Sequence, residues 1–380
     1  MTGWNGLASL IAKDGSRGKP GQRWAWQARA PQSSGRPPLH RALGRGRRMA
    51  DDWLLLSDRA PVADLADGLV EAGMFVVELH LPLDQPVVLL DFHSTAGWPR
   101  TFTLFHDPLV GLVLVHRQGQ SVARHALPGP LPQHACTGRL SLRFDAPARH
   151  WEMRIEFLGR EDLPPRRASG QNPLPIRLED LDQLNHGRAR LSRHAAVLWF
   201  GLTRGADLPA RAPWIGQRTP IQTAEGPVLA GHLKPGDLVA TADGGLLPLR
   251  RITRLDLPAC GSFSPIILRA PFFGASHDML VAADQRVALT GPEVEYLFGE
   301  EWVLVEAGAL VDGHSALAEQ RRAVASVLML EFDHPALILA DGCPLVAASQ
   351  GRSVPMRMLE PYEVLTLMAL LGRASQRRVA

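Results

Sequence analysis

The chain has 380 residues, which is enough for two domains of ordinary size. Hydrophobic residues make up 46% of it and charged residues 21%, a balance typical of globular proteins that bury apolar cores. The formal net charge of +3 is unevenly spread, because residues 1–48 carry ten Lys and Arg and one acid, whereas residues 49–380 sum to −6. The basic character therefore belongs to the first 48 residues, and it does not indicate a nucleic-acid-binding protein.

Residues 1–48 are rich in Gly, Pro, Ser and Arg and lack apolar periodicity, which predicts a disordered segment. Trp24 and Trp26 lie among its basic residues, an arrangement also found in RNA-binding segments. An alternative is that Met49 is the true start, with residues 1–48 upstream of it. The sequence has neither a run of about 18 uncharged apolar residues nor a secretory signal, so we expect no membrane span. This favours the cytoplasm and leaves export open.

Residues 49–160 are expected to form a β-sandwich-like domain. "HWEMRIEF", residues 150–157, alternates apolar and polar side chains, as does "RLSLRFD", residues 139–145. A period of two over four to eight residues is typical of strands with one buried face. "FVVELHL" and "GLVLVHR" add two further strands, with Pro- and Gly-containing turns between the segments. Many short strands at this spacing favour a sandwich or a jelly roll.

The rest of the chain divides by composition into three parts. Residues 161–205 are expected to be a linker that contains a short helix at residues 176–185 and an apolar stretch at residues 194–205. Residues 206–357 contain the turn signals of a second β domain. Residues 358–380 are expected to form a C-terminal helix and tail, with one apolar stripe made by Val364, Leu367, Met368 and Leu371.

Four phrases in the second domain follow one another in a fixed order. They are "TPIQTAEGPVLAGHLKPGDLVATADGGLLPLRRI", "HDMLVAADQRVAL", "LFGEEWVLVEAGALVDGHSA" and "LMLEFDHPALILADGCPL". Pro235-Gly236 and Asp243-Gly244-Gly245 are turn sequences, the second between two strands, and a further hairpin is expected across Asp333-His334-Pro335. With these phrases in this order, residues 219–346 resemble the bacterial Hint (Hedgehog/intein-like) domain family. The resemblance implies an all-β horseshoe fold.

The resemblance also implies a chemistry whose residues are replaced in this chain. In the family a Cys or Ser opens the domain and attacks the preceding carbonyl, and a His in the second phrase acts as its acid/base partner. The nucleophile position corresponds to Trp214, and the histidine position corresponds to Gln285. The chain after residue 345 also lacks the His-Asn pair of inteins. We therefore expect a degenerate active site.

The remaining candidates for chemistry are weak. Thr219 is the nearest hydroxyl to the nucleophile position, Cys260 follows the first hairpin, and His334 lies beside the histidine of the fourth phrase. Cys343 is expected to be buried, Cys136 could form a dyad with His134, and His277-Asp278 should point to opposite faces of a strand. Three widely spaced cysteines form neither a disulfide framework nor a CxxC pair. A metal set of Asp91, His93 and His106 is less favoured than ordinary polar loop residues, so no metal or cofactor is expected.

The sequence thus favours an all-β protein with a sandwich-like N-terminal domain, a Hint-like domain and a short C-terminal helix. Its function is expected to be that of a degenerate Hint scaffold with an unknown protein or glycan partner. One alternative is an autoprocessing protein that uses a non-standard nucleophile. Another is a sandwich that binds a carbohydrate or other ligand through exposed aromatic side chains, for which Trp53, Trp98 and Phe102 are candidates.

Overall fold

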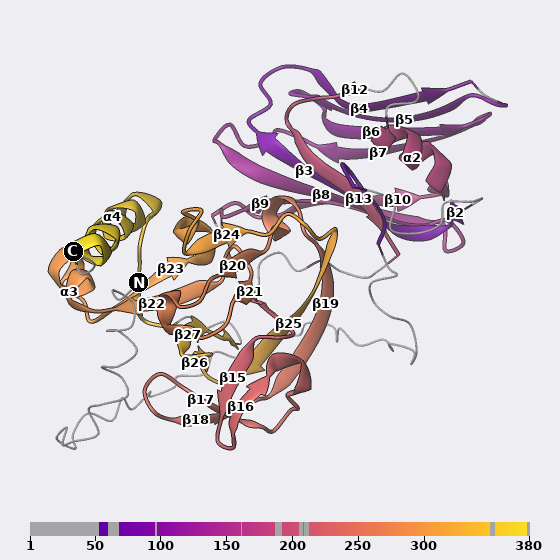
Figure 1. Cartoon of the computed structure of the whole chain (residues 1–380). Coiled ribbons are helices and arrows are strands. Elements are labelled where there is room, and N and C mark those ends of the chain that lie inside the picture. The colour runs from indigo at the N-terminus through magenta and orange to yellow at the C-terminus, as the bar shows by residue number, and fades with distance from the viewer. Residues whose placement is uncertain are drawn as a thin grey trace, which may run out of the picture.

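The computed structural model describes most of the chain after residue 52. The described residues are 53–59, 68–95, 97–160, 162–186, 192–204, 208, 213–349 and 354–377. The expectations for residues 1–48 and for a start at Met49 lie outside them. Strands dominate both halves of the described chain, so the protein is all-β with a short C-terminal helix (Figure 1).

Two antiparallel sheets form the N-terminal β-sandwich (Figure 1). The six-stranded sheet has the order β1 (Trp53–Leu56), β13 (Val197–Thr203), β3 (Ala72–Leu81), β8 (Cys136–Asp145), β9 (His150–Leu158) and β10 (Arg166–Gln171). The five-stranded sheet has the order β12 (Ser192–Arg193), β4 (Val87–Ser94), β5 (Arg100–Asp107), β6 (Gly111–Gln118) and β7 (Ser121–Pro128). A separate pair is formed by β2 (Leu69–Val70) and β11 (Ile176–Arg177).

Apolar side chains that alternate with polar ones along the strands form the core between the two sheets. On β9 the apolar residues Trp151, Met153, Ile155 and Phe157 are all buried, and the polar residues between them are half-buried. The rings of Phe75 and Phe102 meet across the sandwich at a centroid distance of 5.0 Å. The strands expected from period-two patterns therefore carry the core as the sequence predicts.

The structure differs from the expected linker at residues 161–205. This segment supplies β10, β11, β12 and β13 to the sandwich, together with the helix α2 (Leu178–His186). β13 lies between β1 and β3, so the last segment before the second domain is an inner strand of the six-stranded sheet. The polar sequence of β10 reads as linker because β10 is an edge strand whose residues are half-buried or exposed.

The second half of the chain contains two further sheets. The seven-stranded sheet has the order β19 (Arg251–Pro258), β25 (Val324–Phe332), β14 (Ile215–Gly216), β21 (Met279–Val281), β20 (Ile266–Leu268) and β24 (Ala316–Ala318), with β28 (Ala348–Ser349) beside β25. The nine-stranded sheet has the order β18 (Leu246–Pro248), β17 (Leu238–Ala240), β15 (Pro220–Thr223), β26 (Leu337–Ala340), β27 (Cys343–Val346), β22 (Arg286–Thr290), β23 (Trp302–Glu306) and β29 (Arg357–Met358), with β16 (Gly226–Leu229) beside β15.

Residues with positive φ form the turns of this half. Gly236 and Gly244 have φ of +98° and +80°, and Gly244 lies in the turn between β17 and β18, as the sequence predicts. The prediction of a hairpin across residues 333–335 is wrong, because β25 and β26 lie in different sheets. β26 pairs instead with β27 across Asp341 and Gly342, both of which have positive φ.

Short helices complete the second half. They are α3 (Pro292–Phe298), α4 (Pro361–Arg377) and the 3-10 helices η2 (Ala230–His232), η3 (Gly261–Phe263), η4 (Phe272–Gly274) and η5 (Ala307–Leu310). The apolar stripe of α4 faces inward, where Val364 and Leu367 are buried in the core of this half. None of the helices in the described part of the chain has the length and apolar character needed to cross a membrane.

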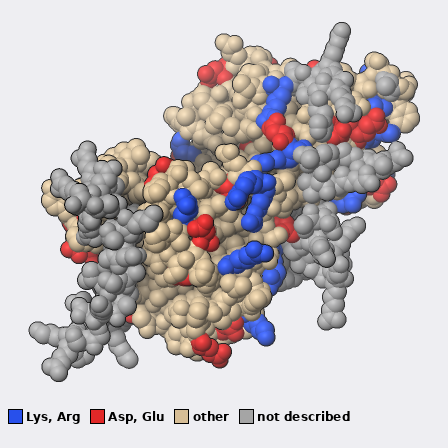
Figure 2. Space-filling view, in the orientation of Figure 1, with Lys and Arg blue, Asp and Glu red and all other residues tan. Residues whose placement is uncertain are grey.

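The sandwich and the second half meet through the six-stranded and seven-stranded sheets. A cluster of buried apolar side chains from both halves, here termed the interdomain cluster, contains Trp53, Leu56, Met74, Val76, Trp199, Trp214, Leu257, Phe263, Ala282, Ala325 and Val327. On the face in Figure 2, basic side chains form a broken band across the middle of the molecule, with acidic side chains among them.

Candidate functional site

Trp214, at the expected nucleophile position, lies directly before β14. Its side chain is 4% exposed and belongs to the interdomain cluster. Its carbonyl oxygen accepts a hydrogen bond from the backbone nitrogen of Ala282 at 3.1 Å. β14 then pairs with both β21 and β25. Trp214 thus serves packing between two sheets, and its indole side chain contains no thiol or hydroxyl that could attack a carbonyl.

Gln285, at the expected histidine position, lies in the turn between β21 and β22. The side chain is 1% exposed, and its Nε2 donates to the carbonyl oxygen of Val346 at 2.9 Å and to that of Arg286 at 3.1 Å. An amide of this kind does not exchange a proton near neutral pH. Gln285 therefore links the β21–β22 turn to β27 as a hydrogen-bond donor.

Substituting Gln285 by alanine is expected to lower the free energy of unfolding by about 1–3 kcal/mol, because the buried carbonyl of Val346 loses its side-chain donor. Urea denaturation followed by circular dichroism measures this change. Gln183→Ala is a matched control, since the Gln183 amide bonds an exposed carboxylate of Glu179 at 3.3 Å. A Gln285→Ala protein as stable as the control would contradict the structural role of this amide.

Thr219, Cys260 and Cys343 lie in surroundings that do not activate them as nucleophiles. Thr219 is 2% exposed, and its Oγ1 has no hydrogen-bond partner among the described residues, so no base is placed to take its proton. Burial and the nearby carboxylate of Glu78 raise the pKa of the Cys260 thiol to about 12. Burial raises the pKa of the Cys343 thiol to about 12 as well. Because the thiolate is the reactive form, both cysteines stay protonated at neutral pH.

The acid and base candidates His277 and Asp278 do not contact each other but bond different residues. His277 faces Asp341 rather than its neighbour Asp278, with Nδ1 3.2 Å from Asp341 Oδ2, and the backbone nitrogen of His277 donates to the same oxygen at 2.6 Å. Asp278 instead accepts a hydrogen bond from the backbone nitrogen of Ala270 at 3.0 Å. The sequence could not show the His277 contact, because its two residues are 64 positions apart.

The residues weighed for metal binding do not form a common site. His93 Nε2 lies 3.0 Å from Asp91 Oδ1 on β4, whereas His106 on the neighbouring strand β5 is buried at 2% exposure and lies opposite Val87, at the other end of β4. Within the ranges that the structure describes, no group of three or more His, Cys, Asp or Glu side chains is placed to hold a metal ion.

His334 lines a pocket that contains residues of β18, β23 and β26 of the nine-stranded sheet. The pocket has a volume of about 390 Å³, within the range of about 300–1,000 Å³ common for ligand sites. Its lining residues are Thr241, Ala242, Asp243, Gly245, Leu246, Leu247, Trp302, His334, Pro335, Ala336, Leu337, Val354 and Met356. Apolar groups dominate this set, and Asp243 and His334 are exposed polar groups of the lining. The structure therefore places His334 at a candidate binding surface.

The aromatic residues considered for carbohydrate binding differ sharply in exposure. Trp53 and Phe102 are 2% and 3% exposed, so neither can stack on a sugar. Trp98 is 50% exposed, and the Arg177 guanidinium carbon lies 5.7 Å from the centre of its ring. The expectation of exposed aromatic side chains is therefore wrong for Trp53 and Phe102, since aromatic residues on strands are usually core residues.

The comparison with protein families indicates a Hint domain in the second half of this all-β chain. The profile of the Hint domain family matches residues 216–351, about a third of the chain. Two solved structures are similar to part of this chain, the MchDnaB-1 intein at 16% identity and its N145AA variant at 17%. Each aligns over 99% of its own length with 35% and 36% of this chain, and both have a TM-score of 0.24. A comparison with curated proteins returned no match.

Proposed function

We propose that the Hint domain of this chain does not cleave itself and acts as a structural scaffold that presents the sandwich to a partner. The observation that carries this proposal is the placement of Trp214, which fills the expected nucleophile position and packs into the interdomain cluster. Gln285 supports it, because the amide is held by the Val346 carbonyl and cannot relay a proton. The two elements of the acyl shift are thus replaced by groups that stabilise the fold.

The partner of the scaffold is a protein or a glycan. The pocket beside His334 supports a protein partner, because Trp302, Leu246 and Met356 offer an apolar surface of the size that holds one or two side chains. Half-exposed Trp98 on the sandwich supports a glycan partner.

The mass of the intact full chain tests the proposal. The purified protein is kept for a day at neutral pH with and without dithiothreitol or hydroxylamine, which would release a thioester or ester. We expect one unchanged mass in every sample. Fragments with a break before Trp214 or near Thr219 would contradict the proposal and favour autoprocessing. In that case Thr219→Ala and Cys260→Ala would identify the nucleophile by abolishing the break.

A further inference from the structure

Strand β3 is covered on both of its faces. Phe75, Val77 and Leu79 point into the core of the sandwich, and Met74 and Val76 belong to the interdomain cluster. All six residues from Met74 to Leu79 are buried, including Glu78. A sandwich strand normally alternates buried and solvated positions, and continuous burial requires a second layer of protein. On β3 the Hint domain provides this second layer.

Aromatic side chains of both domains interlock in the interdomain cluster. Trp199 of β13 makes edge-to-face contacts with Trp53 on one side and with Phe263 of η3 on the other, at centroid distances of 6.2 Å and 6.4 Å. Each of the three rings is no more than 5% exposed. Fully desolvated aromatic residues at the centre of an interface are the usual source of its affinity.

A buried ion pair of the sandwich lies at the same interface. Glu78 and Arg139 are 0% and 3% exposed, with Arg139 Nε 3.0 Å from Glu78 Oε1. Ser262 of the Hint domain completes the pair, because its backbone nitrogen donates to Glu78 Oε2 at 2.8 Å and its hydroxyl oxygen lies 2.5 Å from both Glu78 Oε1 and Arg139 Nη2. The Arg139 guanidinium lies 4.0 Å from the centre of the Phe263 ring. Ser262 thus adds hydrogen bonds from the Hint domain to both members of this ion pair.

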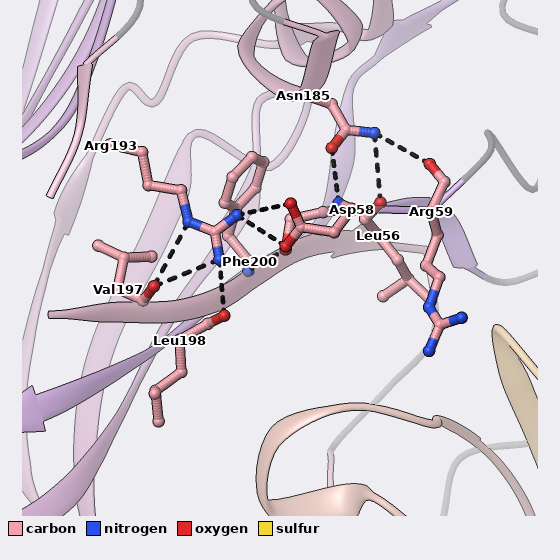
Figure 3. Close-up of polar contacts among 9 residues, drawn as sticks. Leu56, Asp58, Arg59, Asn185, Arg193, Val197, Leu198 and Phe200 are labelled. Atoms are coloured by element: carbon pink, nitrogen blue, oxygen red, sulfur yellow. Dashed lines mark hydrogen bonds and ion pairs between the residues drawn. The ribbon is translucent and has the colours of Figure 1, made fainter. Parts of the chain in front are cut away.

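Further hydrogen bonds close the edge of the interface. Trp53 Nε1 donates to the Asp256 carbonyl at 3.0 Å, and Arg59 Nη1 donates to the Gln320 carbonyl at 2.8 Å. The loop that carries Arg59 is held in place from within the sandwich. Asn185 Nδ2 donates to the Arg59 carbonyl at 3.1 Å. Arg193 Nη1 forms an ion pair with Oδ2 of Asp58, the residue before Arg59, at 2.7 Å (Figure 3).

We propose that the outer face of β3, β8 and β13 is a permanent binding surface for the Hint domain. The two domains then stay bound to each other when the chain between Thr203 and Trp214 is cut. Interfaces between independently moving domains are small and polar, whereas this one is apolar at its centre and contains a satisfied buried ion pair. The inference does not depend on whether the Hint domain can cleave itself, since it concerns the contact that would outlast any cleavage.

The test is to place a site for a sequence-specific protease between residues 208 and 213 of the full chain, cut the purified protein, and measure association by sedimentation over a dilution series. We expect the two fragments to sediment as one 1:1 species at about 1 µM, as obligate partners do. Fragments that separate at this concentration, whether folded or not, would overturn the proposal.

Gly261→Ala in the cut protein should weaken this association. A Cβ at Gly261 would lie 2.1 Å from Trp199 Nε1 and 2.3 Å from Glu78 Oε2, so the loop would be pushed off the sandwich. Gly313→Ala is the matched control, because Gly313 also has positive φ but its Cβ would meet nothing within 4 Å. We expect Gly261→Ala to raise the dissociation constant at least about 30-fold and Gly313→Ala to change it less than about 3-fold. Equal effects of the two substitutions would overturn the assignment of this surface.

Discussion

Replacing Glu78 by alanine is expected to lower the free energy of unfolding by about 3–5 kcal/mol, because it leaves the guanidinium of Arg139 buried without its counter-ion. The backbone nitrogen and hydroxyl of Ser262 lose their acceptor in the same step. Urea denaturation followed by tryptophan fluorescence measures the change. A loss of less than about 1 kcal/mol would mean that the pair is open to solvent.

Two further variants test whether the loss of stability comes from the unpaired buried charge of Arg139 or from other effects of the substitution. Glu152→Ala removes an exposed carboxylate 4.0 Å from Arg167 in the same sheet, and should cost less than about 1 kcal/mol. The double variant Glu78→Met with Arg139→Met leaves no buried charge, and should recover most of the stability lost by Glu78→Ala. A double variant as unstable as Glu78→Ala would place the cost in packing rather than in charge.

The sandwich is expected to lose stability in mild acid because of two histidines on neighbouring strands. His116 on β6 and His125 on β7 are 4% and 2% exposed. Burial lowers the pKa of each from 6.5 to about 4, and the nearby His125 contributes to the lowering at His116. The unfolded chain therefore takes up protons below pH 6.5 that the native protein does not accept until about pH 4. Stability is unaffected above pH 6.5 and falls as the pH drops from 6.5 toward 4.

The expected slope approaches about 1.4 kcal/mol per pH unit for each of these histidines. Urea midpoints measured from pH 7.5 to pH 5 cover this window and avoid the range in which most carboxylates titrate. A variant with His116→Leu and His125→Leu should lose most of the slope. His150→Gln, at an exposed position of β9, should leave it unchanged. The same slope in the double variant as in the parent protein would assign the acid sensitivity to other groups.

Much of the fold could be predicted from local patterns, and what could not depends on contacts between distant residues. The alternation on β9 and the turn at Gly244 are local signals, and both are found in the structure. In the sequence, the second covering of β3 corresponds to the apolar run Met74–Val77, but a run of that kind does not say which layer covers it. The partners Glu78 and Arg139 lie 61 residues apart, and Ser262 lies 184 residues from Glu78.

The candidate site, too, could be predicted from the sequence only in part. The sequence predicts that Trp214 and Gln285 occupy the family's reactive positions, because the order and spacing of the four phrases give the count along the chain. It does not reveal that the Gln285 amide bonds the Val346 carbonyl 61 positions away, or that Trp214 packs against the sandwich. These contacts require the arrangement of the sheets, which periodicity does not supply.

The position of β13 in the sandwich has a consequence for synthesis on the ribosome. β1 pairs with β13, and the backbone nitrogen of Phe200 donates to the Ser57 hydroxyl, 143 positions earlier in the chain. β1 therefore emerges first among the described strands and has no partner until β13 has been made. Trp199 of β13 is covered only when the Hint domain has folded against it. The two domains should accordingly mature together after translation rather than one after the other, and a nascent chain that ends at Thr203 should expose Trp199 and Met74 to chaperones.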